Sequence, residues 1–372
     1  MFGQERSIRG NDDKEFRQDR CHISFWAAHK ALHGKRGFME TIEIAGLDMA
    51  ASRIALGTWA IGGWMWGGTS ARDAIRTIQM ALDRGITLID TAPVYGFGRA
   101  EELVGKALES GNRREKALIA TKVGLDWHDD KIYRNAAPRR IRQEVELSLR
   151  RLRTDHIDLY QLHWPDPSTP IADTAAALGE LVKQGKIRAI GVSNFSPAQL
   201  DEFCRVTPVQ TTQPPYNLFE RAIEKDVLPH AMQKGLVVLA YGALCRGLLS
   251  GKITAGMRFE GDDLRRADPK FQPPRLTQYL EAVRRLDLFA RDNFGKSVIT
   301  LAVRWILDQG PTVALWGARR PEQLDAVADV MGWRLDADAK GEIDRILAET
   351  IASPVGPEFM APPARPTTLA VA

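Results

Sequence analysis

Eight short apolar runs, each separated from the next by a helical pattern, limit the fold of this chain more than any other feature. The runs cover residues 55–60, 86–92, 117–123, 157–164, 187–193, 209–213, 236–241 and 312–317. Amphipathic helices are predicted between them, in segments that include 70–83, 100–109, 138–152, 171–184, 196–205, 222–234 and 297–309. Short, continuously apolar runs indicate strands buried on both faces, and their alternation with helices indicates a parallel sheet. Eight such units closed on themselves predict an α/β fold, a single-domain (β/α)8 TIM barrel.

An open, doubly wound sheet is the main alternative fold. Such sheets carry a Gly-x-Gly-x-x-Gly fingerprint where they bind a dinucleotide. Here Gly96 and Gly98 match the first two positions, but Glu101 stands at the third. The length of 372 residues is within the range of one large barrel, which remains the favoured prediction.

The barrel is predicted to occupy residues 39–352 of the chain. Residues 1–38 are polar, mixed in charge and without periodicity, so they are predicted to be a flexible N-terminal extension. Residues 353–372 are rich in proline and are predicted to form an extended, flexible C-terminal tail. The stretch 246–276 is rich in Gly, Asp, Arg and Pro, and it predicts a long loop after the seventh strand. Loops of this length are usually functional.

Composition and charge exclude several classes of protein. The three cysteines, Cys21, Cys204 and Cys245, have no paired spacing, so we expect neither disulfides nor a metal site. The net charge of +4 is small and gives no reason to expect a nucleic-acid partner. No apolar run approaches the roughly 20 residues of a membrane span, and the N-terminus does not resemble a secretory signal. We therefore expect a cytoplasmic protein with a small-molecule partner, either a monomer or a homo-oligomer.

Polar or aromatic residues end seven of the eight predicted strands. Asp90 ends the second strand and Tyr95 follows it by five residues, while Lys122 and His163 end the third and fourth. The later strands end at Ser193-Asn194, Gln213, Tyr241 and Gly317-Ala318-Arg319. In barrels of this type the carboxyl ends of the strands share one rim, where the catalytic groups lie. The sequence therefore predicts an active site at this rim.

The first four of these groups suit the chemistry of a carbonyl. Tyr95 is a poor acid at neutral pH, because the pKa of a free tyrosine is about 10. A nearby ammonium such as Lys122 stabilises the phenolate and lowers that pKa, and Asp90 keeps the lysine charged. His163 can orient the substrate oxygen. A lone lysine at a strand end is more often a structural ion pair, but four matched positions favour an acid that assists hydride transfer to a carbonyl.

Five segments, taken in order, resemble the aldo-keto reductase superfamily. They are LIDTAPVYG (88–96), ATKV (120–123), YQLHW (160–164), IGVSNF (190–195) and LSGK (249–252). The resemblance runs from about Met39 to Ile351, which is nearly the whole predicted barrel. It implies that Asp90, Tyr95, Lys122 and His163 are the catalytic tetrad of the superfamily. Tyr95 is then the general acid in reduction and the base in oxidation.

The resemblance also implies a nicotinamide cofactor, NADPH, with NADH as the alternative. It places the nicotinamide carboxamide against Ser193, Asn194 and Gln213, and the ring against Tyr241. It assigns the pyrophosphate to the segment that contains Leu244, Leu248, Ser250 and Lys252. It assigns the adenosine 2′-phosphate to the run that contains Gly317, Arg319 and Gln323, where a guanidinium can bind phosphate through two hydrogen bonds.

Two departures from the pattern bear on the cofactor. Relatives often have Ser-Pro-Leu after the stacking aromatic residue, whereas this chain has Gly242-Ala243-Leu244. Relatives usually place an asparagine near the adenine, where this chain has Val327. Both differences are expected to weaken cofactor binding, and they leave NADH open as the alternative to NADPH; the tetrad is intact.

Four tryptophans in or beside the rim loops are predicted to form an aromatic substrate pocket: Trp59, Trp64, Trp127 and Trp164. The alternative is that these side chains only pack the loops onto the barrel. An apolar pocket discriminates weakly between similar substrates, so we expect a broad range of aldehydes.

The leading functional hypothesis is an NADP(H)-dependent reductase of aldehydes and ketones, such as small aldehydes, dicarbonyls or sugars. A sugar or alcohol dehydrogenase working in the oxidative direction uses the same tetrad and stays open. A Schiff-base aldolase that uses Lys122 belongs to another enzyme class. A cofactor-binding subunit without catalytic function, with residues 1–38 as an interaction arm, is a third alternative.

Overall fold

Eight parallel strands form a closed barrel in the computed structural model, which describes residues 38–365. Around the barrel they are β3 (Ile54–Gly57), β4 (Leu88–Asp90), β5 (Leu118–Val123), β8 (Ile157–Leu162), β9 (Ile187–Ser193), β10 (Thr211–Gln213), β11 (Val237–Ala240) and β12 (Thr312–Gly317). Every predicted run supplies one strand, so the predicted (β/α)8 barrel is confirmed. Residues 1–37 of the predicted N-terminal extension, and residues 366–372, lie outside the described residues.

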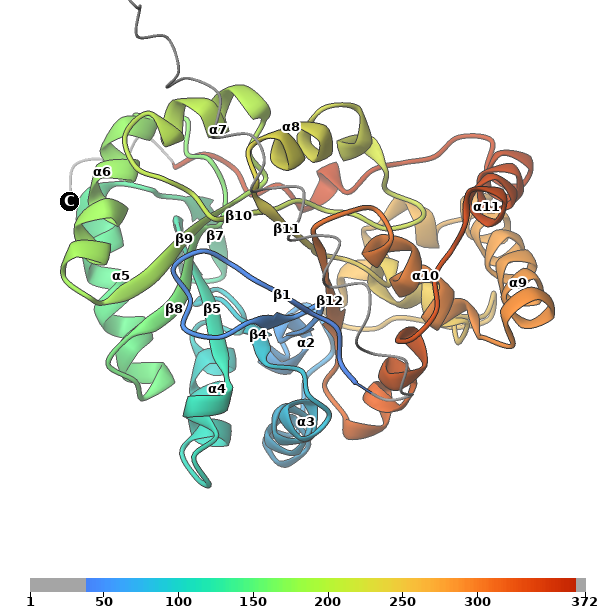
Figure 1. The fold of residues 1–372 in the computed structure, drawn as a ribbon, viewed down its shortest axis with the longest axis horizontal. Helices are drawn as coiled ribbons and strands as arrows, with labels where there is room; N and C mark the ends of the chain where they lie inside the picture. Colours follow the sequence, from blue (N-terminus) through green and yellow to red (C-terminus); the bar gives the residue numbers. More distant parts are fainter. Residues whose placement is uncertain (1–37, 366–372) are drawn as a thin grey trace, which may run out of the picture. The chain divides into compact units, whose positions relative to one another are not determined.

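Helices lie outside the ring of strands, as Figure 1 shows. They are α3 (Ala71–Asp83), α4 (Arg99–Leu108), α5 (Pro138–Leu152), α6 (Ile171–Lys183), α7 (Pro197–Cys204), α8 (Val227–Gln233) and α10 (Val298–Leu307). Each coincides with a predicted helical segment to within a few residues. The exception is 222–234, which divides into a 3-10 turn, η3 (Ala222–Lys225), and α8. No helix between residues 38 and 365 is both long enough and apolar enough to cross a membrane.

The structure adds elements that the sequence did not reveal. The predicted long loop holds only short 3-10 turns, η4 (Cys245–Ser250), η5 (Leu264–Arg266) and η6 (Pro269–Phe271), but it is followed by the 20-residue helix α9 (Arg275–Phe294). Helix α11 (Ala337–Thr350) packs beside α9 (Figure 1). Near the amino ends of the strands lies a short hairpin of β1 (Thr41–Ile42) and β2 (Ala51–Ser52). A second hairpin, β6 (Leu125–His128) with β7 (Lys131–Arg134), follows β5 on the opposite rim.

Alternate residues of the strands fill the inside of the barrel. They form an apolar cluster separate from the one under the helices: Ala55, Leu88, Leu118, Ala120, Leu159, Ala189, Val237, Leu239, Val313 and Leu315. Ile44 and Ala51 of the β1–β2 hairpin belong to the same cluster and close the amino end of the barrel. Because successive side chains of a strand point to opposite faces, residues two further along each strand also face inward. There the apolar filling gives way to buried polar groups, which include Asp90, Lys122 and Gln213.

The described part of the C-terminal tail is attached to the barrel rim by hydrogen bonds. The backbone N–H of Arg134 donates to Pro363 O at 2.9 Å, and its side-chain Nε donates to Pro362 O at 2.8 Å. At the other end of this segment, Lys270 Nζ donates to Gly356 O at 3.1 Å. The tail therefore joins the β6–β7 hairpin to the long loop after β11.

A close contact between two glycines holds the turn after β4 against the first rim loop. The backbone of Gly96 has φ = +68°, and a Cβ atom there would lie 2.3 Å from Gly62 O. A Cβ atom on Gly62 would lie 2.5 Å from Tyr95 O. Neither position has room for a side chain, so the two glycines fix where the turn places Tyr95.

We predict that Gly96→Ala destabilises the fold more than Gly67→Ala does. Gly67 also has a positive φ, +71°, but nothing lies within 4 Å of a Cβ atom built there. The control should cost only the strain of the left-handed backbone, about 1 kcal/mol in the free energy of unfolding. Gly96→Ala must also displace the Gly62 carbonyl, and we expect a loss of about 2–4 kcal/mol. Urea unfolding of both variants measures the difference, and equal losses would contradict the close contact.

Candidate active site

The four predicted catalytic residues lie together at the carboxyl ends of neighbouring strands. Lys122 Nζ donates to Asp90 Oδ2 at 2.7 Å and to the Tyr95 hydroxyl oxygen at 3.2 Å. The rings of Tyr95 and His163 meet edge to face, with centroids 5.8 Å apart. Asp90 ends β4, Lys122 lies near the end of β5, and His163 directly follows β8. The barrel thus assembles the set that the sequence predicted.

Lys122 is completely buried, and each of its three ammonium protons has an acceptor. The third acceptor is the backbone oxygen of Thr91, at 2.9 Å. Burial lowers the pKa of Lys122, and the neighbouring Asp90 carboxylate acts in the opposite direction. Asp90 is 3% exposed, so the two charges form a buried, hydrogen-bonded ion pair. Removing one member of such a pair leaves an uncompensated buried charge, so the loss of either side chain should lower the stability of this rim.

The pKa of Tyr95 differs from the expectation. The sequence suggested that Lys122 lowers it, but in the structure burial raises the pKa of Tyr95 well above its usual value, and the Asp90 carboxylate raises it further. Burial is the larger cause because it disfavours the charged phenolate, and Asp90, 2.7 Å from Lys122 Nζ, adds a negative charge beside the phenol. Tyr95 therefore holds its proton at neutral pH and can donate it in a hydrogen bond.

His163 is a neutral imidazole beside Tyr95. Burial lowers the pKa of His163 well below its usual value, and the positive charge of Lys122 lowers it further. A neutral imidazole has one N–H donor and one nitrogen acceptor, so it can orient an oxygen without adding a charge. The backbone oxygen of His163 accepts a hydrogen bond from Asn194 Nδ2 at 3.1 Å, which links β8 to the end of β9.

Hydroxyl and amide groups from three further strand ends form one hydrogen-bonded chain. Tyr241 OH donates to Asn194 Oδ1 at 3.0 Å, and Asn194 Nδ2 donates to Ser193 Oγ at 3.0 Å. Ser193 Oγ donates in turn to the backbone oxygen of Gln213 at 2.7 Å. The side-chain amide of Gln213 points toward the tetrad, where its Nε2 donates to Asp90 Oδ1 at 2.8 Å. The four residues predicted to bind the nicotinamide portion are thus contiguous with the tetrad.

The segment predicted to meet the pyrophosphate forms the tight turn η4. Ser250 Oγ donates to Gly247 O at 2.6 Å, which closes the turn, and Lys252 is exposed directly after it. The side chain of Leu248 is fully buried in the hydrophobic core, so only its backbone can face a ligand. Leu244 is half-buried against the same core.

Arg319 lies where the sequence placed a phosphate ligand, at the end of β12. Its Nη1 donates to Gly68 O at 2.7 Å and also to Trp66 O, so the guanidinium links β12 to the first rim loop. Gln323 Oε1 accepts from the backbone N–H of Arg319 at 2.9 Å and fixes the turn that follows the exposed Gly317. Burial lowers the pKa of Arg319, but a guanidinium remains charged at any physiological pH.

The chemistry of these donors fits a nicotinamide dinucleotide. Amide and hydroxyl groups can satisfy both the donors and the acceptor of a carboxamide, the Tyr241 ring offers an aromatic face, and Arg319 offers a guanidinium for phosphate. No group of three or more His, Cys, Asp or Glu side chains able to hold a metal occurs between residues 38 and 365.

Two of the predicted pocket tryptophans, Trp59 and Trp164, lie near Tyr95. The Trp59 ring stacks on the Tyr95 ring, with centroids 5.8 Å apart and an interplanar angle of 19°. The sequence analysis placed Trp59 in the first strand. In the structure Trp59 instead begins the helical turn α2 (Trp59–Gly62), shortly after that strand. Trp164 and Tyr95 both pack against one small apolar cluster of Ala92, Val94 and Leu125, and the Arg134 guanidinium lies 5.0 Å from the Trp164 ring centroid.

The other two pocket tryptophans, Trp64 and Trp127, are joined by a residue that the sequence analysis did not single out. The Phe97 ring lies 5.2 Å from Trp64 and 5.6 Å from Trp127. Its position two residues after Tyr95, between two glycines of the turn, was the available signal. We call the rings of Trp59, Trp64, Phe97 and Trp127 the aromatic wall. Its residues come from the first rim loop, the turn after β4 and the β6–β7 hairpin.

Gln161 is a second residue that the prediction missed. It is fully buried, and its Nε2 donates to Asp90 Oδ1 at 3.2 Å. Its Oε1 accepts from Gln213 Nε2 at 3.0 Å. The signal in the sequence was a polar residue two positions before His163, on the same inward face of β8 as the apolar Leu159.

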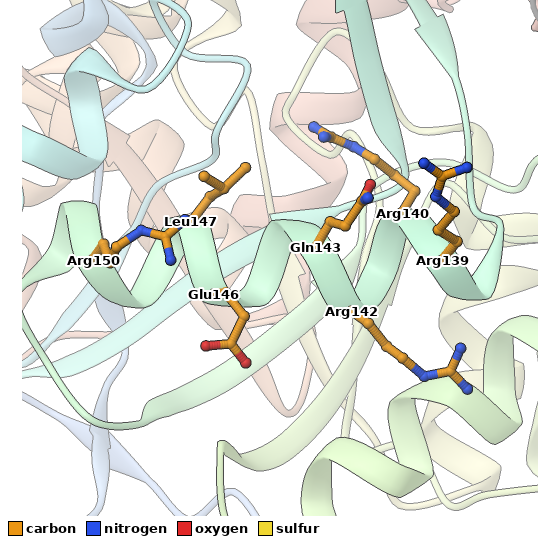
Figure 2. A pocket seen from close by; sticks show the side chains of 7 residues that line it. All are labelled: Arg139, Arg140, Arg142, Gln143, Glu146, Leu147 and Arg150. Carbon is orange, nitrogen blue, oxygen red and sulfur yellow. The ribbon is translucent and has the colours of Figure 1, made fainter. Parts of the chain in front are cut away.

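A hollow on the outer surface is unrelated to this site. It has a volume of about 580 Å³ and is lined by Arg139, Arg140, Arg142, Gln143, Glu146, Leu147 and Arg150. Figure 2 shows that all seven side chains come from the single helix α5. None of them contacts the tetrad, so the strand ends, and not this hollow, are the candidate active site.

The lowered pKa of His163 predicts a pH-dependent contribution to stability. In the unfolded chain a histidine takes up its proton near pH 6.5, but the folded protein resists protonation until a lower pH. The unfolded state therefore binds more protons below about pH 6.5, and stability decreases as the pH falls through that value. Between pH 7 and pH 5.5 the free energy of unfolding of the wild type should decrease. In His163→Gln this decrease should be smaller by about 1 kcal/mol. Urea unfolding at both pH values measures this, and the exposed His128→Gln is the control; identical slopes for His163→Gln and the wild type would refute it.

Comparisons with known proteins agree with this geometry. The model of the Aldo/keto reductase family matches residues 53–348. The chain is 58% identical to aldo-keto reductase YhdN of Bacillus subtilis, over 88% of this chain and 99% of that protein. It is 37% identical to the NADH-specific methylglyoxal reductase of Escherichia coli, over 84% of this chain and 99% of that protein. The structure of a glycerol dehydrogenase from Gluconobacter oxydans superimposes with a TM-score of 0.79 and 56% identity, covering 86% of this chain and 99% of that one. The chain therefore belongs to the aldo/keto reductase family and is an NAD(P)H-dependent oxidoreductase.

Proposed function

We propose that this protein reduces small aldehydes and ketones to alcohols, with NADPH as the preferred cofactor and Tyr95 as the general acid. The observation that carries the proposal is the buried Lys122, which donates to Asp90 and Tyr95 at the same time. This contact ties the protonated phenol to a fixed ammonium at the point where three strand ends and the turn after β4 meet. An arrangement of this kind supplies a proton to an oxygen that gains negative charge.

Each residue of the tetrad has a separate role in the proposed reduction. The carbonyl oxygen of the substrate is held by the Tyr95 hydroxyl and by the neutral imidazole of His163. A nicotinamide cofactor, held by the residues described below, would supply the hydride that reduces the carbonyl carbon. Tyr95 transfers its proton to the carbonyl oxygen as that oxygen becomes an alkoxide, and a proton from water later restores the phenol. Lys122 stabilises the phenolate left on Tyr95, and Asp90 keeps Lys122 charged and oriented.

The cofactor is assigned to three remaining groups of rim residues. Ser193, Asn194 and Gln213 would hold the nicotinamide carboxamide, while Tyr241 would cover one face of the ring. The backbone and side chains of 244–252 would meet the pyrophosphate. Arg319 would bind the 2′-phosphate, which is the reason for preferring NADPH, and Gln323 orients the backbone on which Arg319 lies.

Two relatives support small oxygenated substrates. By their names, one acts on methylglyoxal and another on glycerol, and we extend this class of compound to the present chain. The tetrad serves both directions, so oxidation of a small alcohol is the second candidate function. The aldolase alternative is disfavoured because Lys122 Nζ is fully buried and has three acceptors, whereas a Schiff base needs an accessible amine. The cytoplasmic location and the oligomeric state stay predictions of the sequence.

We predict that Tyr95→Phe abolishes turnover without impairing cofactor binding. The change removes only the acidic hydroxyl, so kcat should fall by roughly 10²-fold or more. The affinity for NADPH, followed by quenching of protein fluorescence, should stay within a few fold. The assay is the loss of NADPH absorbance with methylglyoxal, glyceraldehyde and an aromatic aldehyde. Tyr133→Phe, on the β6–β7 hairpin, is the matched control and should retain turnover. Wild-type kcat in Tyr95→Phe would show that the acid is wrongly assigned.

We further predict that Arg319→Ala weakens the binding of NADPH far more than that of NADH. The guanidinium is assigned to a phosphate that only NADPH carries, and a charge-assisted pair of this kind contributes roughly 1.5–3 kcal/mol. The exposed neighbour Arg320 gives the control, because Arg320→Ala should change both affinities by a similar small factor. Dissociation constants for both cofactors are measured by fluorescence titration. Equal weakening of NADPH and NADH in Arg319→Ala would show that this residue does not recognise the 2′-phosphate.

A further inference from the structure

We propose that Gln161 is a positioning residue of the active site, whose side-chain amide fixes the Asp90 carboxylate on one side and the Gln213 amide on the other. The inference rests on the proposed function, in which Asp90 orients Lys122 for proton donation by Tyr95. Gln161 itself touches neither the phenol nor the lysine through any hydrogen bond of its side chain, so its effect on the reaction is exerted through Asp90.

Gln161 lies inside the barrel, in the polar layer above the apolar floor and next to the reacting groups. On β8 it pairs with Lys122 of β5 on one side and with Gly191 of β9 on the other, and Gly191 pairs with Thr211 of β10. These four residues form one row across four strands. Gln161 has the same inward orientation as His163, two residues later, and it is fully buried.

The glycine in this row makes space for the side chain of Gln161. A Cβ atom on Gly191 would lie 2.8 Å from Gln161 Cγ and 2.4 Å from Thr211 Oγ1. The long side chain therefore occupies the volume that any other residue at 191 would fill. Packed in this way, it has little freedom to turn away from Asp90 and Gln213.

The hydrogen bonds divide the two oxygens of Asp90 between two tasks. Oδ2 accepts from Lys122 Nζ at 2.7 Å, whereas Oδ1 accepts from Gln161 Nε2 at 3.2 Å and from Gln213 Nε2 at 2.8 Å. The two amides are also bonded to each other, because Gln213 Nε2 donates to Gln161 Oε1 at 3.0 Å. The closed set of three bonds sets the rotation of the carboxylate, and with it the direction from which Asp90 holds Lys122.

An apolar side chain of similar length removes both functions of the amide at once. With Gln161→Met, Oδ1 of Asp90 loses one donor and Gln213 loses one acceptor, while most of the volume remains. The carboxylate can then rotate, and the ammonium moves relative to the phenol. Because small misplacements of catalytic groups reduce rates by up to about 10²-fold, we expect kcat to fall by about tenfold or more. The substrate KM should stay within about threefold.

Thr211→Val is the matched control for packing in the same row. Thr211 Oγ1 is buried and has no hydrogen-bond partner, so this nearly isosteric change alters the same layer without removing a bond to the catalytic set. We expect the kcat of Thr211→Val to equal that of the wild type. Thermal unfolding of each variant establishes that the protein is folded at the assay temperature. A folded Gln161→Met protein whose kcat lies within about twofold of the wild type would overturn the proposal.

A double-mutant cycle tests whether Gln161 acts through Asp90. If it does, adding Gln161→Met to Asp90→Asn should cause little further loss of the residual kcat, since the group that Gln161 positions is already changed. Independent losses that multiply would overturn the proposal. Tyr95→Phe, measured in the same assay, separates the two levels of inference. If Tyr95→Phe loses turnover and Gln161→Met keeps it, only the role of Gln161 fails; if Tyr95→Phe keeps turnover, the proposed function fails.

Discussion

The buried ion pair of Lys122 and Asp90 is the interaction on which the rest of the rim depends. Two opposite charges with almost no exposure to water are tolerated only when each hydrogen-bonding position is occupied. Thr91, Tyr95, Gln161 and Gln213 supply those hydrogen-bond partners. The ion pair therefore fixes the positions of side chains from several strands. The buried surroundings of this pair also keep the nearby phenol protonated, because burial raises the pKa of Tyr95 and the Asp90 carboxylate raises it further.

The barrel provides this arrangement through the alternation of its strands. Inward positions that hold leucine, valine or alanine in the lower layers hold Asp90, Lys122, Gln161 and Gln213 in the uppermost ones. A floor of packed apolar side chains excludes water from below, and the aromatic wall around Trp59 and Phe97 covers the tetrad from the side. Catalytic groups therefore lie at the boundary between a dry interior and the mouth of the barrel, where charge interactions are strong and a substrate can still enter.

The loops explain most of the differences between expectation and structure. The β6–β7 hairpin, helix α9 and the attached tail depend on contacts between segments far apart in the chain. Arg134, for example, bonds to Pro362 and Pro363, more than 220 residues away. Local sequence patterns cannot predict a contact between segments so far apart in the chain. The expected lowering of the Tyr95 pKa was wrong for a similar reason, because the net pKa depends on burial and on the distance of Asp90 as well as on Lys122.

The sequence by itself determined the repeated strand–helix order, the eight barrel strands and the residues at their carboxyl ends, including Asp90, Lys122, His163 and Gln213. These follow from local periodicity and from the rule that parallel strands of a barrel end at one rim. Only the tertiary structure decided that Gln213 and Gln161 bond to Asp90, that Arg319 links to the first rim loop, and that Tyr95 and His163 remain uncharged. Hydrogen-bond partners and pKa values depend on distances and burial, which arise when the barrel closes and which no stretch of sequence contains.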